Sequence, residues 1–420
     1  MATTAPEPRK HILILGGSYA GLSTAHYLLK HAVPRLPRPD SYQVVLVSPS
    51  TEVLCRPACP RAMVSADLLP QDQLFVSIPE LFAGYPAANF RFEHGSAVHL
   101  DHDKRTVLIQ SAATQREESV EYHALVIATG ASTPSPLLGL SRDADSGFLR
   151  RNWGTLREAL PAAKNIVIAG GGPAGVETAG ELGEYLNGRA GWLNCKMEKP
   201  KVRITVVTSA TQILPALRPG IAAKAETFLA QVGVNVVKNT QVAAVTPENS
   251  GTADALVTPT KVALTDGNTL EADIYIPATG TSPNTGYIEK SLLGLDGRVE
   301  NNRSTLRVDG AGPRVYAIGD VASYSRPAVH AILNAVPVLG ANMKRDLLLA
   351  SGSEAAVGAD REYQEDTRET QMVPIGQSKG VGAAMGYQLP SWMVWLIKGR
   401  DYWLWTTGGL WSGKQWAKES

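Results

Sequence analysis

The stretch Asn165-Ile-Val-Ile-Ala-Gly-Gly-Gly-Pro-Ala-Gly175 decides the fold of this chain. A short apolar run leads directly into glycines at 170, 172 and 175, and a helical pattern over 176–187 and a second apolar run over 202–207 follow. This order predicts a βαβ unit. Gly170 permits a tight turn, Gly172 lets the backbone approach a pyrophosphate, and Gly175 allows close packing of helix on strand.

The same pattern occurs earlier in the chain. The apolar run 11–15 precedes a glycine-rich turn, a helical segment over 20–30 and an apolar run over 43–47. Ser18 stands where the motif has its middle glycine, and its small side chain still allows close approach to a phosphate. The residues of this turn predicted to bind a dinucleotide are Gly16, Gly17, Ser18, Tyr19, Ala20 and Gly21.

Three further strand ends carry small or acidic residues. Two apolar runs end in Ala128-Thr129-Gly130 and Ala278-Thr279-Gly280, and a third ends in Ile318-Gly319-Asp320. A carboxylate in the position of Asp320 can accept a hydrogen bond from a ribitol hydroxyl, while nearby helix N–H groups face a pyrophosphate. Two dinucleotide folds in one chain predict a flavoprotein that binds FAD in the first unit and NAD(P)H in the second.

Neither unit has the acid that usually reads a ribose hydroxyl. The strand of the first unit ends in Val47-Ser48, and that of the second in Val207-Thr208-Ser209. An acid in the second unit would repel the 2′-phosphate of NADP. We therefore expect this unit to accept both NADH and NADPH.

The composition excludes several function classes. The 420 residues carry a formal net charge of +1, which removes the electrostatic case for nucleic-acid binding. Three cysteines do not make a disulfide scaffold or a four-cysteine zinc site, and the eight histidines form no metal-binding motif, so no metal is expected. No apolar run approaches the length of a spanning helix. We expect a cytoplasmic enzyme, with its oligomeric state left open.

We expect an α/β fold with two Rossmann-like domains and a small C-terminal subdomain. The predicted division places the first part of a discontinuous FAD domain at 1–150 and an NAD(P)H domain at 151–280. The second part of the FAD domain is expected at 281–350, and a Trp-rich subdomain at 351–420. Six of the eight tryptophans lie in that last segment, interleaved with lysine and arginine. They are expected to pack on the main body, to form a peripheral membrane contact, or both.

The motifs as a set resemble the FAD- and NAD(P)-dependent pyridine nucleotide oxidoreductase superfamily over nearly the whole chain. Gly170–Glu177 in sequence, Tyr316-Ala-Ile-Gly-Asp320, and the tail residues Gly380-Val-Gly382 and Lys398-Gly-Arg-Asp401 are similar to the ferroptosis suppressor branch. That branch resembles apoptosis-inducing factor and is related to type II NADH dehydrogenases. The resemblance implies reduction of quinones by NAD(P)H through FAD. It also implies FAD contacts that include Arg61 and Ala97, and a catalytic Glu177 beside the nicotinamide.

Three alternatives to quinone reduction stay open. A disulfide reductase could use Cys55 and Cys59, although three residues separate them where that class has four. A flavin enzyme could act on a specialised biosynthetic metabolite. A flavoprotein of this fold could also sense redox state without turnover.

Overall fold

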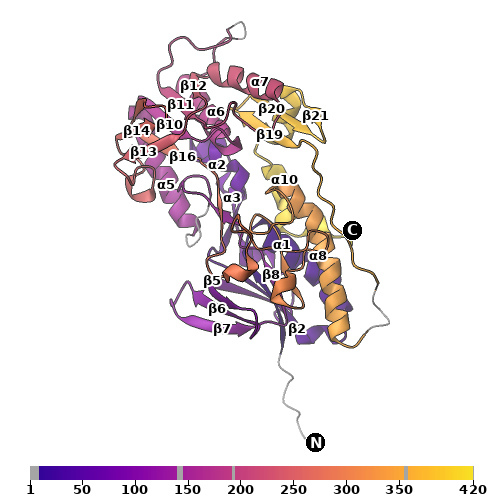
Figure 1. The fold of residues 1–420 in the computed structure, drawn as a ribbon. Coiled ribbons are helices and arrows are strands. Elements are labelled where there is room, and N and C mark those ends of the chain that lie inside the picture. Colours follow the sequence, from indigo (N-terminus) through magenta and orange to yellow (C-terminus); the bar gives the residue numbers. More distant parts are fainter. Residues whose placement is uncertain (1–8, 140–144, 192–193, 354–357, 420) are drawn as a thin grey trace, which may run out of the picture.

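The computed structural model describes residues 9–139, 145–191, 194–353 and 358–419. Two parallel sheets dominate it, one in the lower half of Figure 1 and the other in the upper half. A smaller C-terminal unit packs beside the upper sheet. This arrangement confirms the expected α/β fold with two Rossmann-like units and a C-terminal subdomain.

The larger sheet has seven strands in the order β18-β8-β1-β2-β5-β6-β7. The first five in this order run parallel, and β6 and β7 extend the sheet as antiparallel strands. A late segment, β18, joins the sheet beside β8, so the first unit is discontinuous in sequence. The strands are β1 Lys10–Leu15, β2 Tyr42–Ser48, β5 Phe90–Asp101, β6 Thr106–Ser111, β7 Glu117–Glu121, β8 Ala124–Ile127 and β18 Val315–Ala317.

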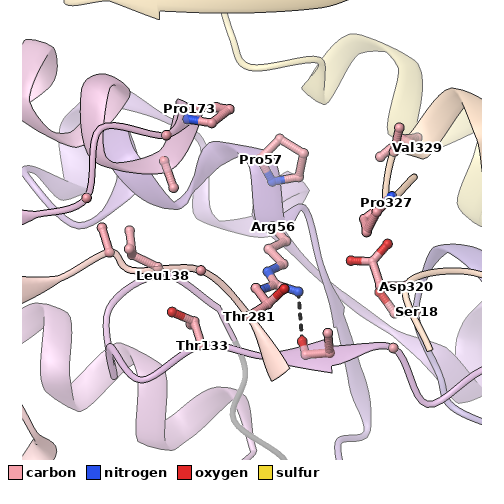
Figure 2. Close-up of a pocket in the computed structure, with 18 of the residues that line it drawn as sticks. Ser18, Arg56, Pro57, Thr133, Leu138, Pro173, Thr281, Asp320, Pro327 and Val329 are labelled. Atoms are coloured by element: carbon pink, nitrogen blue, oxygen red, sulfur yellow. Dashed lines mark hydrogen bonds between the residues drawn. The ribbon is translucent and has the colours of Figure 1, made fainter. Parts of the chain in front are cut away.

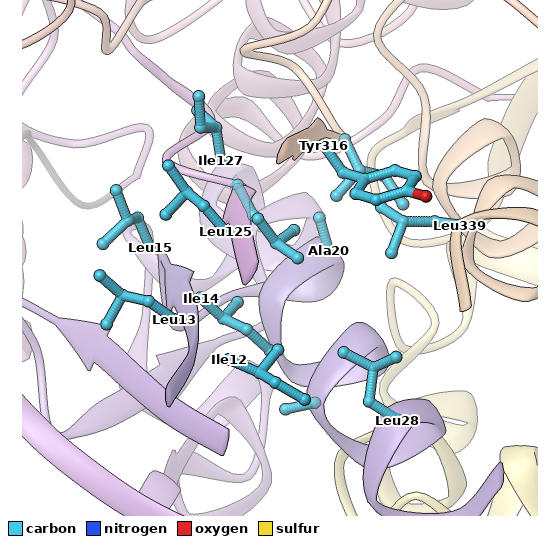
Figure 3. Packing of buried hydrophobic residues seen from close by; sticks show 14 of the residues in the cluster. Ile12, Leu13, Ile14, Leu15, Ala20, Leu28, Leu125, Ile127, Tyr316 and Leu339 are labelled. Atoms are coloured by element: carbon cyan, nitrogen blue, oxygen red, sulfur yellow. The ribbon is translucent and has the colours of Figure 1, made fainter. Parts of the chain in front are cut away.

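The main core forms where two helices cover this sheet. Helices α1 (Tyr19–Tyr27) and α8 (Val329–Ala350) pack against each other, and a π-helical turn, Leu28–Ala32, continues α1. Figure 3 shows residues of β1 and β8 meeting Leu28, Tyr316 and Leu339. Four consecutive residues of β1, from Ile12 to Leu15, are buried because parallel strands are covered on both faces.

The second sheet has four parallel strands in the order β12-β11-β10-β16. Helices α6 (Pro173–Asn187) and α7 (Pro219–Ala230) pack against each other beside it, and α6 begins three residues before the predicted start. A three-stranded antiparallel sheet, β13-β14-β15, accompanies it. The strands are β10 Asn165–Ala169, β11 Arg203–Val207, β12 Val234–Val237, β13 Val242–Thr246, β14 Thr260–Leu264, β15 Thr269–Ala272 and β16 Ile274–Pro277.

The C-terminal unit contains a three-stranded sheet that packs against α6 and α7. Its strands and helices are β19 Gln371–Ile375, β20 Lys379–Ala384, β21 Tyr387–Gln388, α9 Ser391–Val394, the π-helical turn Trp395–Gly399 and α10 Leu404–Trp411. The other strands and α-helices of the described residues are β3 Glu52–Leu54, β4 Phe75–Ser77, β9 Ala131–Ser132, β17 Ser282–Pro283, α2 Cys59–Ala62, α3 Gln71–Leu74, α4 Ile78–Leu81 and α5 Ser146–Ala159, and short 3-10 turns connect them.

The end of the chain is held on α1 and the π-helical turn after it. His26 Nε2 donates to the carbonyl of Trp411 at 2.8 Å, and His31 Nε2 donates to that of Trp416 at 2.8 Å. Burial lowers the pKa of His26 to about 4, so the ring is neutral at physiological pH. Trp411 and Trp416 are buried, so these two tryptophans pack on the main body.

Candidate active site

A cavity of about 860 Å³ lies where the carboxyl ends of the two parallel sheets meet. The residues that follow β1, β8, β10, β16 and β18 all contribute to its lining. Ligands of open α/β sheets bind at the carboxyl ends of the strands. Figure 2 shows this cavity with side chains from both units directed into it.

Both glycine turns line the cavity and are built alike. Gly16 and Gly170 have φ of +119° and +127°, and a Cβ on either would lie within 2.2 Å of the carbonyl oxygen of Ala128 or Ala278. Gly21 and Gly175 do not line the cavity; each packs its Cα against the carbonyl of Gly16 or Gly170 and so brings helix to strand. The residues of the two turns that line the cavity are Gly16, Gly17, Ser18, Tyr19, Ala20, Gly170, Gly171, Gly172, Pro173 and Ala174.

The ends of the neighbouring strands also line this cavity. Thr129, Gly130, Gly280, Gly319 and Asp320, which the sequence analysis assigned to cofactor binding, all line the cavity. Burial raises the pKa of Asp320, and the positive charges of Arg56 and Arg298 oppose that rise. Because Asp320 lines the cavity, its side chain lies next to space that a hydroxyl-bearing ligand can fill.

Glu177 of α6 lines the cavity and forms a buried ion pair that the sequence reading missed. Its Oε1 lies 2.5 Å from Nζ of Lys398, which also donates to the carbonyl of Met372 at 3.0 Å. Both side chains are at most 8% exposed. Burial raises the pKa of Glu177 to about 7, against the lowering effect of the Lys398 charge.

Trp403 adds an aromatic wall beside this pair. Its side chain lines the cavity, and Lys398 Nζ lies 4.9 Å from its ring centroid. Lys398 and Trp403 come from a segment more than 200 residues after Glu177. The sequence signals for them were the resemblance at Lys398-Gly-Arg-Asp401 and the Trp-rich character of 351–420, and neither indicates a position in the cofactor cavity.

Two residues predicted to contact FAD are not among the residues that line this cavity. Arg61 is 3% exposed and its guanidinium binds the carboxylate of Glu181 outside the cavity lining. Ala97 lies within β5, where it pairs with Ile109 of β6. Glu181 is itself 2% exposed.

Arg56 is a cavity residue that the sequence analysis overlooked. Its Nη1 donates to the carbonyl of Ala131 at 2.9 Å, and Figure 2 shows the guanidinium between Thr281 and Asp320. Its only sequence signal was its position inside the Cys55–Cys59 stretch. A guanidinium here presents further N–H donors to a bound phosphate or carbonyl oxygen.

The two cysteines of that stretch are poorly suited to thiol chemistry. Both are buried outside the cavity lining, and Tyr19 donates its hydroxyl hydrogen to Cys55 Sγ at 3.5 Å. Burial raises the pKa of Cys55 to about 11 and that of Cys59 still further. Because the thiolate is the reactive form, burial disfavours thiol chemistry at these two cysteines at neutral pH.

We therefore expect Cys55→Ser to turn over NAD(P)H at the wild-type rate. Steady-state kinetics of the variant against Cys195→Ser, which changes an exposed thiol, check this. A collapse of the rate in Cys55→Ser alone would contradict it and restore a role for the Cys55 thiol.

The amino-acid sequence matches a known family. A family model described as pyridine nucleotide-disulphide oxidoreductase matches residues 9–335. The chain belongs to this family. It is 60% identical, over the full length of both chains, to oxidoreductase phnG of Penicillium herquei. It is 25% identical to ferroptosis suppressor protein 1 of Xenopus laevis over 405 residues, 94% of each chain.

The solved structures agree on the fold. NDH2 from Plasmodium falciparum, in complex with NADH, has a TM-score of 0.64 with 14% identity and covers 98% of this chain and 100% of its own. These relatives confirm the predicted superfamily. The protein is an enzyme, an NAD(P)H-dependent flavin oxidoreductase, and its cofactors are FAD and NAD(P)H.

The cavity fits these cofactors. Two glycine turns face it, and around Gly172 no protein atom lies within 4 Å of an added Cβ. Helices α1 and α6 begin at these turns, so their unpaired N–H groups and positive dipole ends face the space that two pyrophosphates require.

Proposed function

We propose that the enzyme passes reducing equivalents from NAD(P)H through FAD to a quinone-like small-molecule acceptor. The observation that carries this proposal is the Glu177–Lys398 pair beside Trp403, in the same cavity as both glycine turns. In this proposal the FAD domain comprises 1–150 and 281–350, the NAD(P)H domain 151–280, and the C-terminal unit 351–420.

The cavity residues divide between the two cofactors. We assign FAD to the first glycine turn and to Thr129, Gly130, Gly319 and Asp320, and NAD(P)H to Gly170, Gly172 and Gly280. When bound, FAD supplies the carrier that accepts a hydride from NAD(P)H and passes two electrons on. The chain itself supplies orientation, exclusion of water and proton transfer.

The ion pair meets the proton requirement of this reaction. Reduction of a quinone to its hydroquinone by NAD(P)H consumes one hydride and one proton. The Lys398 ammonium can donate a hydrogen bond to the acceptor carbonyl oxygen, and Glu177, with its pKa near 7, can deliver a proton to that oxygen and recover one from solvent. Trp403 offers a flat surface against which a planar ring can stack.

An anaerobic absorbance titration tests the proposal. We expect the purified protein to show a flavin band that NADH or NADPH bleaches and that a short-chain quinone restores. A band that bleaches but returns only with oxygen or another acceptor would remove the quinone. A bound flavin that neither nucleotide bleaches would contradict the assignment of the second unit and favour a sensing role.

Nucleotide preference follows from the end of β11. Thr208 and Ser209 line the cavity where an acid would exclude NADPH. We expect Ser209→Asp to weaken NADPH use by about 10–100-fold and to spare NADH, since a like-charge contact costs about 1–4 kcal/mol.

Steady-state KM values for both nucleotides measure the change. Ser209→Asn, which has the same size without the charge, serves as the control. Equal losses for both nucleotides in Ser209→Asp would contradict a selective effect on the 2′-phosphate.

The C-terminal unit also presents an exposed aromatic surface. The exposed fractions are 62% for Trp392, 36% for Trp395, 45% for Leu396 and 58% for Trp405, and Trp405 Nε1 donates to the carbonyl of Ile397. We propose that this surface makes the peripheral membrane contact, because indole rings favour the interfacial region. Within the described ranges, no helix has the length and apolar character to cross a bilayer.

Replacing Trp392, Trp395 and Trp405 together by serine is expected to lower binding to liposomes. A sedimentation assay checks this, with Tyr185→Ser as a control that removes an exposed aromatic ring from α6. Unchanged binding by the triple variant would contradict the membrane contact. Truncation at 391 is unsuitable, because it would also remove Lys398 and Trp403 from the cavity.

A further inference from the structure

Helix α6 carries three glutamates on one face, and each forms an ion pair; two of the cations come from distant segments, and the third lies just after the helix. Glu177 pairs with Lys398, Glu181 with Arg61, and Glu184 with Arg189. Positions four and three residues apart lie on the same face of a helix. The face is therefore a ladder of ion pairs, and its first pair lines the cofactor cavity.

Arg61, the second cation of this ladder, joins three segments. Its Nε and Nη2 donate to the Glu181 carboxylate at 3.0 and 2.8 Å, and Nη2 also donates to the carbonyl of Gly376 at 3.2 Å. Its Nη1 donates to the carbonyls of Gly399 and Arg400 at 2.7 and 3.1 Å. The guanidinium thus holds the chain immediately after Lys398 against α6.

The segment that Arg61 holds has a strained backbone. Tyr402 and Trp403 are consecutive bulky residues in the left-handed region, with φ of 54° and 70°. Such conformations persist only where the surroundings enforce them. The Tyr402 hydroxyl donates to Glu181 Oε1 at 2.9 Å, and the Arg61 guanidinium lies 4.8 Å from the Tyr402 ring centroid.

We propose that Arg61, together with Glu181, is a positioning residue that holds the 399–403 turn so that Lys398 and Trp403 face the cofactor cavity. This inference deepens the function proposed above, which assigns those two side chains to the acceptor. It gives Arg61 a role that involves no contact with FAD. Arg61 of α2 is thus hydrogen-bonded both to α6 and to three carbonyls of the C-terminal unit.

The charges of this network also act on the cavity carboxyl. Glu177 faces Lys398, Glu181 and Arg61; the cations lower its pKa, whereas burial and the Glu181 charge raise it. Loss of the Arg61 charge therefore shifts the Glu177 titration to higher pH. A side chain that only filled space would leave that titration unchanged.

The test compares Arg61→Met with Arg189→Met in full-length protein. Arg189 makes the matching ion pair with Glu184 and binds the carbonyl of Ile375, but it does not contact the 399–403 turn. Hydrogen exchange of the peptide covering 398–405 should increase in Arg61→Met and stay at the wild-type level in Arg189→Met. FAD titration of the apoprotein should give unchanged affinity in both variants.

Infrared spectroscopy can follow protonation of the Glu177 carboxyl, whose band is identified because it is absent in Glu177→Gln. The midpoint of this titration should shift to higher pH in Arg61→Met and stay unchanged in Arg189→Met. Arg61→Lys should restore most of the titration because it keeps the charge. These readouts do not depend on the acceptor, so a failed quinone assay leaves them informative.

Two results would overturn the proposal. One is weakened FAD binding in Arg61→Met with normal exchange over 398–405, which would make Arg61 a cofactor ligand. The other is identical behaviour of the Arg61 and Arg189 variants. If Arg61→Met does not fold, Tyr402→Phe provides the test, since it removes only the hydroxyl hydrogen bond to Glu181. Unchanged hydrogen exchange over 398–405 in that variant would refute the proposed positioning of the 399–403 turn.

Discussion

Replacing Lys398 by methionine is expected to lower turnover on the order of 100-fold or more, because loss of one hydrogen-bond donor to an oxygen that gains negative charge costs about 10²–10³ in rate. The change removes the partner of Glu177 and leaves that carboxyl buried without a cation. Stopped-flow absorbance separates the two half-reactions. We expect oxidation of the flavin by the acceptor to slow more than its reduction by NAD(P)H.

The pH dependence provides a second readout of the same pair. Because the pKa of Glu177 is about 7 in the folded protein, turnover of the wild type should change across pH 7. Loss of the Lys398 charge should move that transition to higher pH, and Glu177→Gln should abolish it. Lys414→Met, which changes an exposed lysine of the C-terminal segment, is the control. Wild-type turnover in Lys398→Met would contradict the assignment.

The free energy of unfolding should depend on pH through the titration of Glu177. Its pKa is raised in the folded state above the usual value near 4.5. Between these two values the unfolded chain loses the proton while the folded chain keeps it, so Glu177 stabilises the protein at low pH and this contribution is lost as pH rises through about 7. Chemical denaturation of wild type and Glu177→Gln at pH 5 and pH 8 measures the difference.

Substituting Gly172 by valine is expected to weaken NAD(P)H binding by about 10–100-fold, since hydrogen bonds to charged groups contribute about 1.5–3 kcal/mol each. The φ of Gly172 is −74°, which any residue adopts, and no protein atom lies within 4 Å of an added Cβ. The side chain therefore fits the fold and fills the space where the backbone would approach the pyrophosphate.

Nucleotide affinity measured by flavin bleaching checks this second effect. FAD content should stay at the wild-type level, because the first glycine turn is untouched. Gly220→Val is the control, as that glycine of α7 also has open space around it. Unchanged NAD(P)H affinity in Gly172→Val would show that the second turn is not the nicotinamide nucleotide site. Gly170→Ala cannot substitute for this test, because its Cβ would collide with the carbonyl of Ala278.

The local parts of this protein were predictable from the sequence. The apolar runs of β1 and β10 and the glycine turns after them follow from neighbours in the chain, because a strand, a tight turn and a helix are each determined by a few consecutive residues. The pairing of Thr129-Gly130 and Thr279-Gly280 with those turns could also be anticipated, since carboxyl ends of parallel strands meet at one edge.

The charged and aromatic residues of the site were decided by the tertiary structure. The sequence does not specify which acidic residue Arg61 or Lys398 binds. Tertiary packing pairs Arg61 with Glu181 and Lys398 with Glu177. Burial then sets the pKa of Glu177, and burial depends on segments far apart in the chain. The sequence by itself determined which nucleotide-binding units form; the fold decided which side chains face them, because long-range contacts leave no local pattern.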